Sequence, residues 1–201
     1  MKIIGLCGGS GSGKGMVAEL FSVYGIMSVD TDAVYHELTS RKSPCLDEIV
    51  NAFGNDILNG DGSLNRKELA KIVFSGENSM LKRSMLNRIS HKHVLDKTKE
   101  IISECEKNGA EIVAIDAPLL FESGFNKECD FIVAVIADSD LRIDRIMARD
   151  GIDKNAATLR IKSQLPDSYL IENSDYHLVN NGSFDDLEKQ VSNLILKLKC
   201  I

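Results

Sequence analysis

The sequence predicts an α/β fold: a parallel five-stranded sheet with helices on both faces. An apolar run at residues 2–7 leads into a glycine cluster and then an amphipathic helix at residues 16–23. A second apolar run at residues 25–30 follows, so the order strand, loop, helix, strand forms a βαβ unit. Continuous apolar runs at residues 111–116 and 130–136 are typical of parallel strands covered on both faces.

The remaining elements follow from periodicity and turn residues. Residues 33–108 are mostly helical by pattern, and the arginine-rich residues 138–165 return to helix. Ser183 is a candidate N-cap for the last helix. The expected helices are residues 46–53, 66–74, 79–106 and 185–199, and the last expected strand is residues 177–181.

Length and composition indicate one domain with a substantial core. The chain has 201 residues, of which 43% are hydrophobic. Its net charge of −6 disfavours a nucleic-acid partner, and the sequence predicts no oligomeric state. No apolar run is long enough for a membrane span, and the N-terminus lacks signal-peptide features. Five cysteines without zinc-ligand spacing favour reduced thiols in a cytoplasmic protein.

The segment GGSGSGKGM predicts a phosphate-binding loop. Gly8, Gly13 and Lys14 satisfy G-x-x-x-x-G-K between a strand and a helix. Backbone N–H groups and the helix N-terminus would face phosphate oxygens, and Lys14 adds a full positive charge. The residues expected to bind ATP here are Gly9, Ser10, Gly11, Ser12, Gly13, Lys14, Gly15 and Met16.

Gly15 departs from this motif, which usually has Ser or Thr as a Mg²⁺ ligand. Glycine offers no side-chain oxygen, so a water would fill the position, and Ser12 or Ser10 are weaker candidates. We expect ATP binding to survive and turnover to fall, by about 1–4 kcal/mol of transition-state stabilisation.

Three acids follow predicted strands. Ligands of open α/β sheets gather at the carboxyl ends of strands. Asp32 suits the base that accepts the proton of an attacking hydroxyl, although Asp30, Asp32 or both could instead cap the next helix. Asp116, after four apolar residues, suits a Mg²⁺ ligand, and Asp30 is a second candidate through water.

Arginines recur along the predicted helix after residue 138. Arg142, Arg145 and Arg149 share one helical face, which suits a lid over phosphates. The alternative is a solvated face paired with nearby aspartates, among them Asp150.

Taken together, the chain resembles the dephospho-coenzyme A kinase family over essentially its whole length. The resemblance rests on the opening IIGLCGGSGSGK, on VDTDAVYHE and on DAPLLFESG, and the combination of the last two is its specific part. It implies a three-layer P-loop kinase fold, with a core of residues 1–32, 109–137 and 171–201, a helical CoA-binding insertion (33–108) and a helical lid (138–170).

The resemblance also implies a reaction and roles for residues. The γ-phosphoryl group of ATP, with Mg²⁺, would pass to the ribose 3′-hydroxyl of dephospho-CoA. Asp32, Lys14 and Arg145 would be catalytic, and Arg149 would contact ATP phosphates. Asp32, Arg66, His91 and Leu119 would lie on the acceptor side.

The chain departs from the family pattern at several positions. Gly15-Met16 replaces Ser-Thr, Lys92 replaces a proline, and Arg142 replaces a glutamine. We expect the last two changes to be tolerated at the surface or in the lid. Two alternatives stay open: a kinase for another nucleotide, and an ATP- and CoA-binding protein impaired by Gly15.

Overall fold

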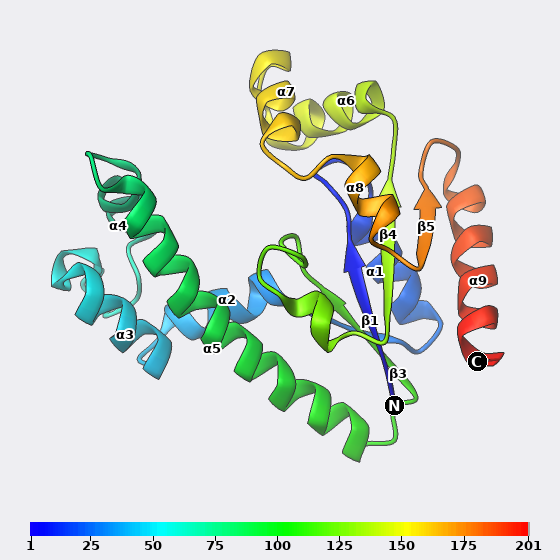
Figure 1. The fold of residues 1–201 in the computed structure, drawn as a ribbon, viewed down its shortest axis with the longest axis horizontal. Helices are drawn as coiled ribbons and strands as arrows, with labels where there is room; N and C mark the ends of the chain where they lie inside the picture. Colours follow the sequence, from blue (N-terminus) through cyan, green and yellow to red (C-terminus); the bar gives the residue numbers. More distant parts are fainter. Residues whose placement is uncertain (201) are drawn as a thin grey trace. The chain divides into compact units, whose positions relative to one another are not determined.

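The computed structural model describes residues 1–200, and it confirms the predicted five-stranded α/β fold (Figure 1). The strands are β1 (Lys2–Cys7), β2 (Met27–Asp30), β3 (Ile112–Asp116), β4 (Phe131–Ile136) and β5 (Tyr176–Val179). Their order in the sheet is β2-β3-β1-β4-β5, and β1 pairs in parallel with both β3 and β4. The central strand therefore has neighbours on both sides at its carboxyl end, where ligands of such sheets bind.

Helices account for most of the remaining chain. They are α1 (Lys14–Val23), α2 (Thr31–Ser40), α3 (Pro44–Phe53), α4 (Arg66–Phe74), α5 (Ser79–Lys107), α6 (Ser139–Asp150), α7 (Lys154–Lys162), α8 (Asp167–Glu172) and α9 (Phe184–Cys200), with 3₁₀ turns η1 (Asn55–Ile57) and η2 (Phe125–Glu128). None of the helices described between residues 1 and 200 is long and apolar enough to cross a membrane.

Alternation along β1 separates the two faces of the sheet. Ile4 and Leu6 point into a core shared with α1 and α9, which pack against each other. Gly5 faces the opposite side, where a Cβ would press on Leu120 and Cys129. In Figure 1, α9 runs alongside β5.

The chain divides into two compact units. The first combines residues 1–29 with the chain from residue 106 onward, and the second is Asp30–Cys105. The second unit contains α2 to α5 and has its own core, formed by Cys45, Leu46, Ile49, Ile57, Leu64, Leu69, Val73 and Ile89.

Local signals explain most helix ends. Gly151 adopts a left-handed conformation (φ 65°) and ends α6, so the arginine-rich segment is two helices. The predicted cap at Ser183 is confirmed: the Asp186 N–H donates to Ser183 Oγ (3.2 Å), and the Ser183 N–H donates to Asp186 Oδ2 (3.0 Å).

Candidate functional site

The glycine loop joins β1 to α1 and has a backbone that side chains would disturb. Gly11 (φ 78°) and Gly13 (φ 94°) both lie in the left-handed region. A Cβ on Gly11 would come 2.6 Å from the carbonyl oxygen of Arg142, and one on Gly13 would collide with the Asn180 amide. Glycine is therefore required at positions 11 and 13 by the close approach of other chain segments as well as by the turn.

Lys14 and Asp116 form an ion pair beside this loop, and both side chains are largely buried. The parallel register explains the pairing, because Leu6 of β1 lies opposite Asp116 of β3, one residue before the end of β1. A lysine for phosphate and a carboxylate at the next strand end thus meet at one edge of the sheet.

A magnesium ion fits this edge with few protein ligands. Asp116 offers a carboxylate, and Mg²⁺ in proteins is held by one or two carboxylates with several waters. A Cβ on Gly15 would have nothing within 4 Å, so this position has room for water.

Neither loop serine offers a hydroxyl that is both accessible and unpaired: Ser12 Oγ has no hydrogen-bond partner among the described residues but is buried, and Ser10 Oγ is bonded to Gln164. Ser12 has no exposed surface, so its hydroxyl is enclosed by the protein. Ser10 Oγ accepts a hydrogen bond from Gln164 Nε2 (3.2 Å). The interpretation that favours water over Ser12 or Ser10 agrees with these positions.

Arg145, which the sequence analysis places among the catalytic candidates, lies against the loop. Its Nη1 donates to the Gly11 carbonyl (3.2 Å), and its Nη2 donates to the Asn180 carbonyl (3.0 Å). The Asn180 side chain in turn donates to the Ser12 carbonyl (2.8 Å). The predicted strand 177–181 ends earlier, at Val179, and the N–H of the next residue, Asn180, still donates to the Ile136 carbonyl of β4 (2.8 Å). The carbonyl and side chain of Asn180 connect α6 to the loop.

Arg142 lies in α6, within the expected lid segment, and it is buried, so the alternative of a solvated arginine face does not describe it. Only 3% of the residue is exposed, and its guanidinium donates to the Ser10 carbonyl and to Asp167. The sequence missed Asp167 because it belongs to α8, a helix of six residues that is too short to show a periodic pattern. By contrast, Lys92 is exposed, as expected.

Arg149 does not reach the loop. Its Nε donates to Asp150 Oδ1 (2.7 Å), and Arg160 pairs with the same carboxylate. These hydrogen bonds lower the pKa of Asp150 from 3.8 to about 2, and the one from Arg149 is the larger cause. In this structure Arg149 is ion-paired, as in the solvated-face alternative, whereas Arg145 is bonded to the loop backbone.

A pocket opens beside the start of the loop. Residues 7–9, 118–122 and 163–165 line it, together with Leu170. Leu119, an expected acceptor-side residue, is 48% exposed in its wall. Burial raises the pKa of the Cys7 thiol to about 12, so this wall residue stays protonated at neutral pH and is no nucleophile.

The second unit begins with the two acids of VDTD. Asp30 is the N-cap of α2, and its Oδ1 accepts from the N–H groups of Asp32 (2.8 Å) and Ala33 (3.1 Å). The capping alternative is therefore correct for Asp30 and wrong for Asp32, which lies in the first turn of α2 and is exposed. The Asp32 carboxylate is not needed as the cap, so it is available for chemistry.

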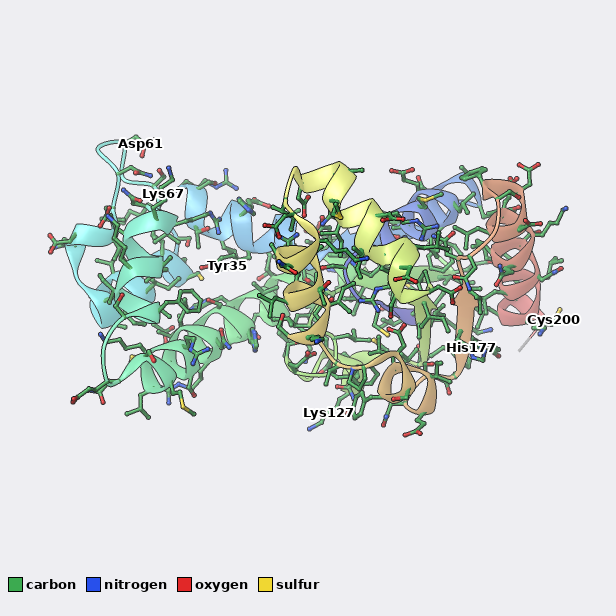
Figure 2. All side chains as sticks on the ribbon, turned by 90° about the horizontal axis from the view of Figure 1, so that it is seen from above. Tyr35, Asp61, Lys67, Lys127, His177 and Cys200 are labelled. Atoms are coloured by element: carbon green, nitrogen blue, oxygen red, sulfur yellow. The ribbon has the colours of Figure 1, made fainter. Side chains whose placement is uncertain are left out.

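The other acceptor-side candidates also lie in the second unit. Arg66 Nη2 donates to Thr39 Oγ1 (2.8 Å), and its guanidinium lies 5.0 Å from the centre of the Tyr35 ring. Figure 2 shows Tyr35 within the helical unit, whereas Asp61 lies on the loop at its edge. His91 and His93 are both half-buried, and His93 Nε2 is 2.7 Å from Glu48 Oε2.

Comparison with known proteins identifies the family. The family model described as dephospho-CoA kinase matches residues 2–186. The chain belongs to the dephospho-CoA kinase family.

Individual relatives agree with this assignment. A dephospho-CoA kinase of Corynebacterium efficiens is 37% identical over 195 residues, covering 97% of this chain and 96% of the relative. One from Fusobacterium nucleatum is 39% identical over 189 residues, or 94% of both chains.

Solved structures show the same fold. A Thermus thermophilus protein superposes with a TM-score of 0.79 at 29% identity, covering 98% of this chain and 97% of its own. A dephospho-CoA kinase from Campylobacter jejuni gives 0.72 at 23% identity, covering 98% of both chains. A shikimate kinase from Acinetobacter baumannii gives 0.57 at 17% identity, covering 99% of this chain and 95% of its own, so the fold is that of P-loop kinases.

Proposed function

We infer that this protein phosphorylates the ribose 3′-hydroxyl of dephospho-CoA with ATP, giving CoA and ADP, the last step of coenzyme A synthesis. Membership of the dephospho-CoA kinase family carries the inference. The meeting of Lys14, Asp116 and Arg145 at the glycine loop supports it, because phosphoryl transfer depends mainly on positioning and charge stabilisation.

The first unit supplies the groups for the nucleotide. We propose that residues 9–16 bind the ATP phosphates, with the Lys14 ammonium on the outer ones. Arg145, already held at the Gly11 carbonyl, stabilises charge that develops on the transferred group. Residues 138–170, which carry Arg145 and Arg149, form the lid in this proposal, and Arg149 would leave Asp150 to contact phosphate.

Asp116 is the proposed metal ligand, with water at the position that Gly15 leaves open. Mg²⁺ would neutralise charge on the phosphates when bound. Lys14 pairs with Asp116 in this structure, and in this proposal its ammonium turns from that carboxylate toward phosphate when the nucleotide binds. Asp30 would act only through water, since its Oδ1 already caps α2.

The second unit supplies most of the groups for the acceptor. We propose that Asp32 accepts the proton of the attacking 3′-hydroxyl, and that residues 33–108 bind dephospho-CoA. Thr39 and Tyr35 hold the guanidinium of Arg66, which reduces the entropy lost when it binds an anionic group of the acceptor. His91 and Leu119 are the other proposed acceptor contacts. We also propose that the protein acts in the cytoplasm.

An ADP-release assay with several acceptors tests the proposal. We expect ADP with dephospho-CoA and background release with AMP or nucleosides, and a CoA product that carries the new phosphate at the 3′ position. Asp32→Asn should lower kcat by roughly 10²–10⁴-fold, the usual range for a general base.

Asp61→Asn is the matched control. Asp61 is exposed on a loop of the same unit, and its Oδ1 accepts from the N–H and the hydroxyl of Ser63, a role that an asparagine oxygen can fill. Equal rates for Asp32→Asn and the control would remove Asp32 as the base. Faster phosphoryl transfer to AMP or a nucleoside than to dephospho-CoA would overturn the proposal that dephospho-CoA is the acceptor.

A further inference from the structure

Helix α6 contains a buried arginine, Arg142, to which the proposed function gives no role. Arg142 is 3% exposed, although arginine is rarely buried this far without a partner. Its Nη1 donates to Asp167 Oδ1 (2.8 Å), its Nε donates to the Ser10 carbonyl (2.9 Å), and a longer contact joins Nη2 to Gln164 Oε1 (3.4 Å). One guanidinium thus connects α6, the start of α8 and the middle of the glycine loop.

Gln164 completes the enclosure of Ser10. Its Oε1 accepts from the Ser10 N–H (2.9 Å), while its Nε2 donates to Ser10 Oγ (3.2 Å). The backbone N–H, the carbonyl and the hydroxyl of Ser10 therefore all bond to Arg142 or Gln164. Every polar group of Ser10 is thus bonded to a side chain that is more than 130 positions away in the sequence.

The backbone of α6 reinforces this contact at the next residue. A Cβ on Gly11 would come 2.6 Å from the Arg142 carbonyl oxygen and 2.9 Å from its Cα. One turn along α6, Arg145 donates to the Gly11 carbonyl. The loop is thus held at two consecutive residues by one helix.

From these contacts we propose that Arg142, together with Asp167 and Gln164, is a positioning residue that holds residues 9–11 of the loop in their nucleotide-binding form before nucleotide arrives. The proposal rests on the proposed function only in taking ATP as the loop's ligand. A loop that is already ordered loses less entropy on binding, so the contacts raise the affinity for ATP.

A direct phosphate contact does not explain Arg142 as well. Its Nε, Nη1 and Nη2 all bond to protein groups, and 3% exposure leaves little surface for a ligand. The planar guanidinium can bond to Ser10 and Asp167 in two directions at once, whereas a lysine would provide a single charged point. Arginine is therefore the residue type that this junction requires.

The experiment compares Arg142→Ala, Arg142→Lys and Asp167→Asn with the unaltered protein. Isothermal titration with ATP and Mg²⁺ gives Kd, and steady-state rates give kcat and KM for each substrate. We expect Arg142→Ala to raise the Kd and KM for ATP about tenfold, which corresponds to about 1.4 kcal/mol. Kcat and the KM for the acceptor should change by less than about twofold.

A second readout follows the loop without any ligand. Amide hydrogen exchange at residues 9–11 should become faster in Arg142→Ala, and less so in Arg142→Lys. Arg41→Ala is the matched control, since Arg41 is 73% exposed and pairs only with Glu37 in the other unit. It should leave ATP affinity and loop exchange unchanged.

Distinct outcomes decide the proposal. A lower melting temperature in Arg142→Ala, with unchanged Kd for ATP and unchanged loop exchange, would show a purely structural role and overturn it. A large fall in kcat at constant Kd would instead make Arg142 a contact of the reacting phosphate, and would overturn it too. If Arg142→Ala does not fold, Asp167→Asn and Arg142→Lys must still raise the Kd for ATP.

The outcome of this test does not depend on which molecule accepts the phosphoryl group. ATP titration and amide exchange do not require any transfer to dephospho-CoA. A protein that fails to phosphorylate dephospho-CoA while Arg142→Ala still loosens the loop and weakens ATP binding would refute the proposed function and support this inference.

Discussion

Gly15 is the residue whose chemistry differs most from what its motif requires. It is the second residue of α1, it is exposed, and a Cβ there would meet open space. A serine therefore fits without disturbing the loop. It also brings back the hydroxyl that such loops place on Mg²⁺.

We predict that Gly15→Ser raises the Mg²⁺-dependent rate by about tenfold or more, within the 1–4 kcal/mol attributed to one stabilising group. Initial rates over a Mg²⁺ titration provide the measurement. Gly15→Ala is the control: it gains up to about 1 kcal/mol of helix stability but no ligand. If serine and alanine raise the rate equally, the hydroxyl has no functional part.

At the scale of single elements, the start of α2 separates capping from metal binding. The Asp30 side chain accepts two backbone N–H groups, and asparagine can do the same without the charge. We predict that Asp30→Ala lowers the free energy of unfolding by about 1 kcal/mol, whereas Asp30→Asn changes it little. Urea denaturation measures both.

The same pair of variants tests Asp30 as a water-mediated Mg²⁺ ligand. If the charge matters to the metal, both variants should weaken the Mg²⁺ dependence of the rate, although only alanine loosens the helix. An Mg²⁺ dependence unchanged in Asp30→Asn would limit Asp30 to its role as a cap.

The junction of α6 and α7 has a predictable acid response. Asp150 pairs with Arg149 and Arg160, and its pKa in the folded protein falls from 3.8 to about 2. A depressed carboxyl pKa contributes stability that is fully present above pH 3.8 and lost as the pH falls through about 2.

We predict that Asp150→Asn is less stable than the unaltered protein above pH 3.8, and that the two converge near pH 2. Denaturation midpoints across this range would show it. A difference that stays constant down to pH 2 would mean that the ion pairs contribute nothing and that asparagine acts by another route.

Elements of this chain could be predicted where a local signal exists. The glycine loop, the strands beside it and the cap at Ser183 all have sequence patterns, and each was found. The partners of Arg142 could not be found in this way, because Asp167 is 25 residues distant and lies in a six-residue helix. Its burial depends on tertiary packing, which periodicity along one helix does not encode.

At the scale of the whole molecule, the chain separates its proposed tasks between two compact units. The glycine loop, Asp116 and Arg145 belong to the unit that contains the sheet, whereas Asp32, Arg66 and His91 belong to the helical unit. The two units have separate hydrophobic cores. We therefore expect each substrate to change amide exchange mainly in one unit.

Hydrogen exchange with single substrates tests this division. We predict that ATP slows amide exchange at residues 9–16 and in α6, and that dephospho-CoA slows it in α2 and α4. Ligand at about 100 times its Kd should also stabilise the protein by about 2.7 kcal/mol. Arg66, which Thr39 and Tyr35 hold in place, is a proposed contact for an anionic group of dephospho-CoA. Arg66→Ala should therefore remove the protection by dephospho-CoA and leave the protection by ATP unchanged. Protection by dephospho-CoA that is confined to the sheet unit would contradict an acceptor site in residues 33–108.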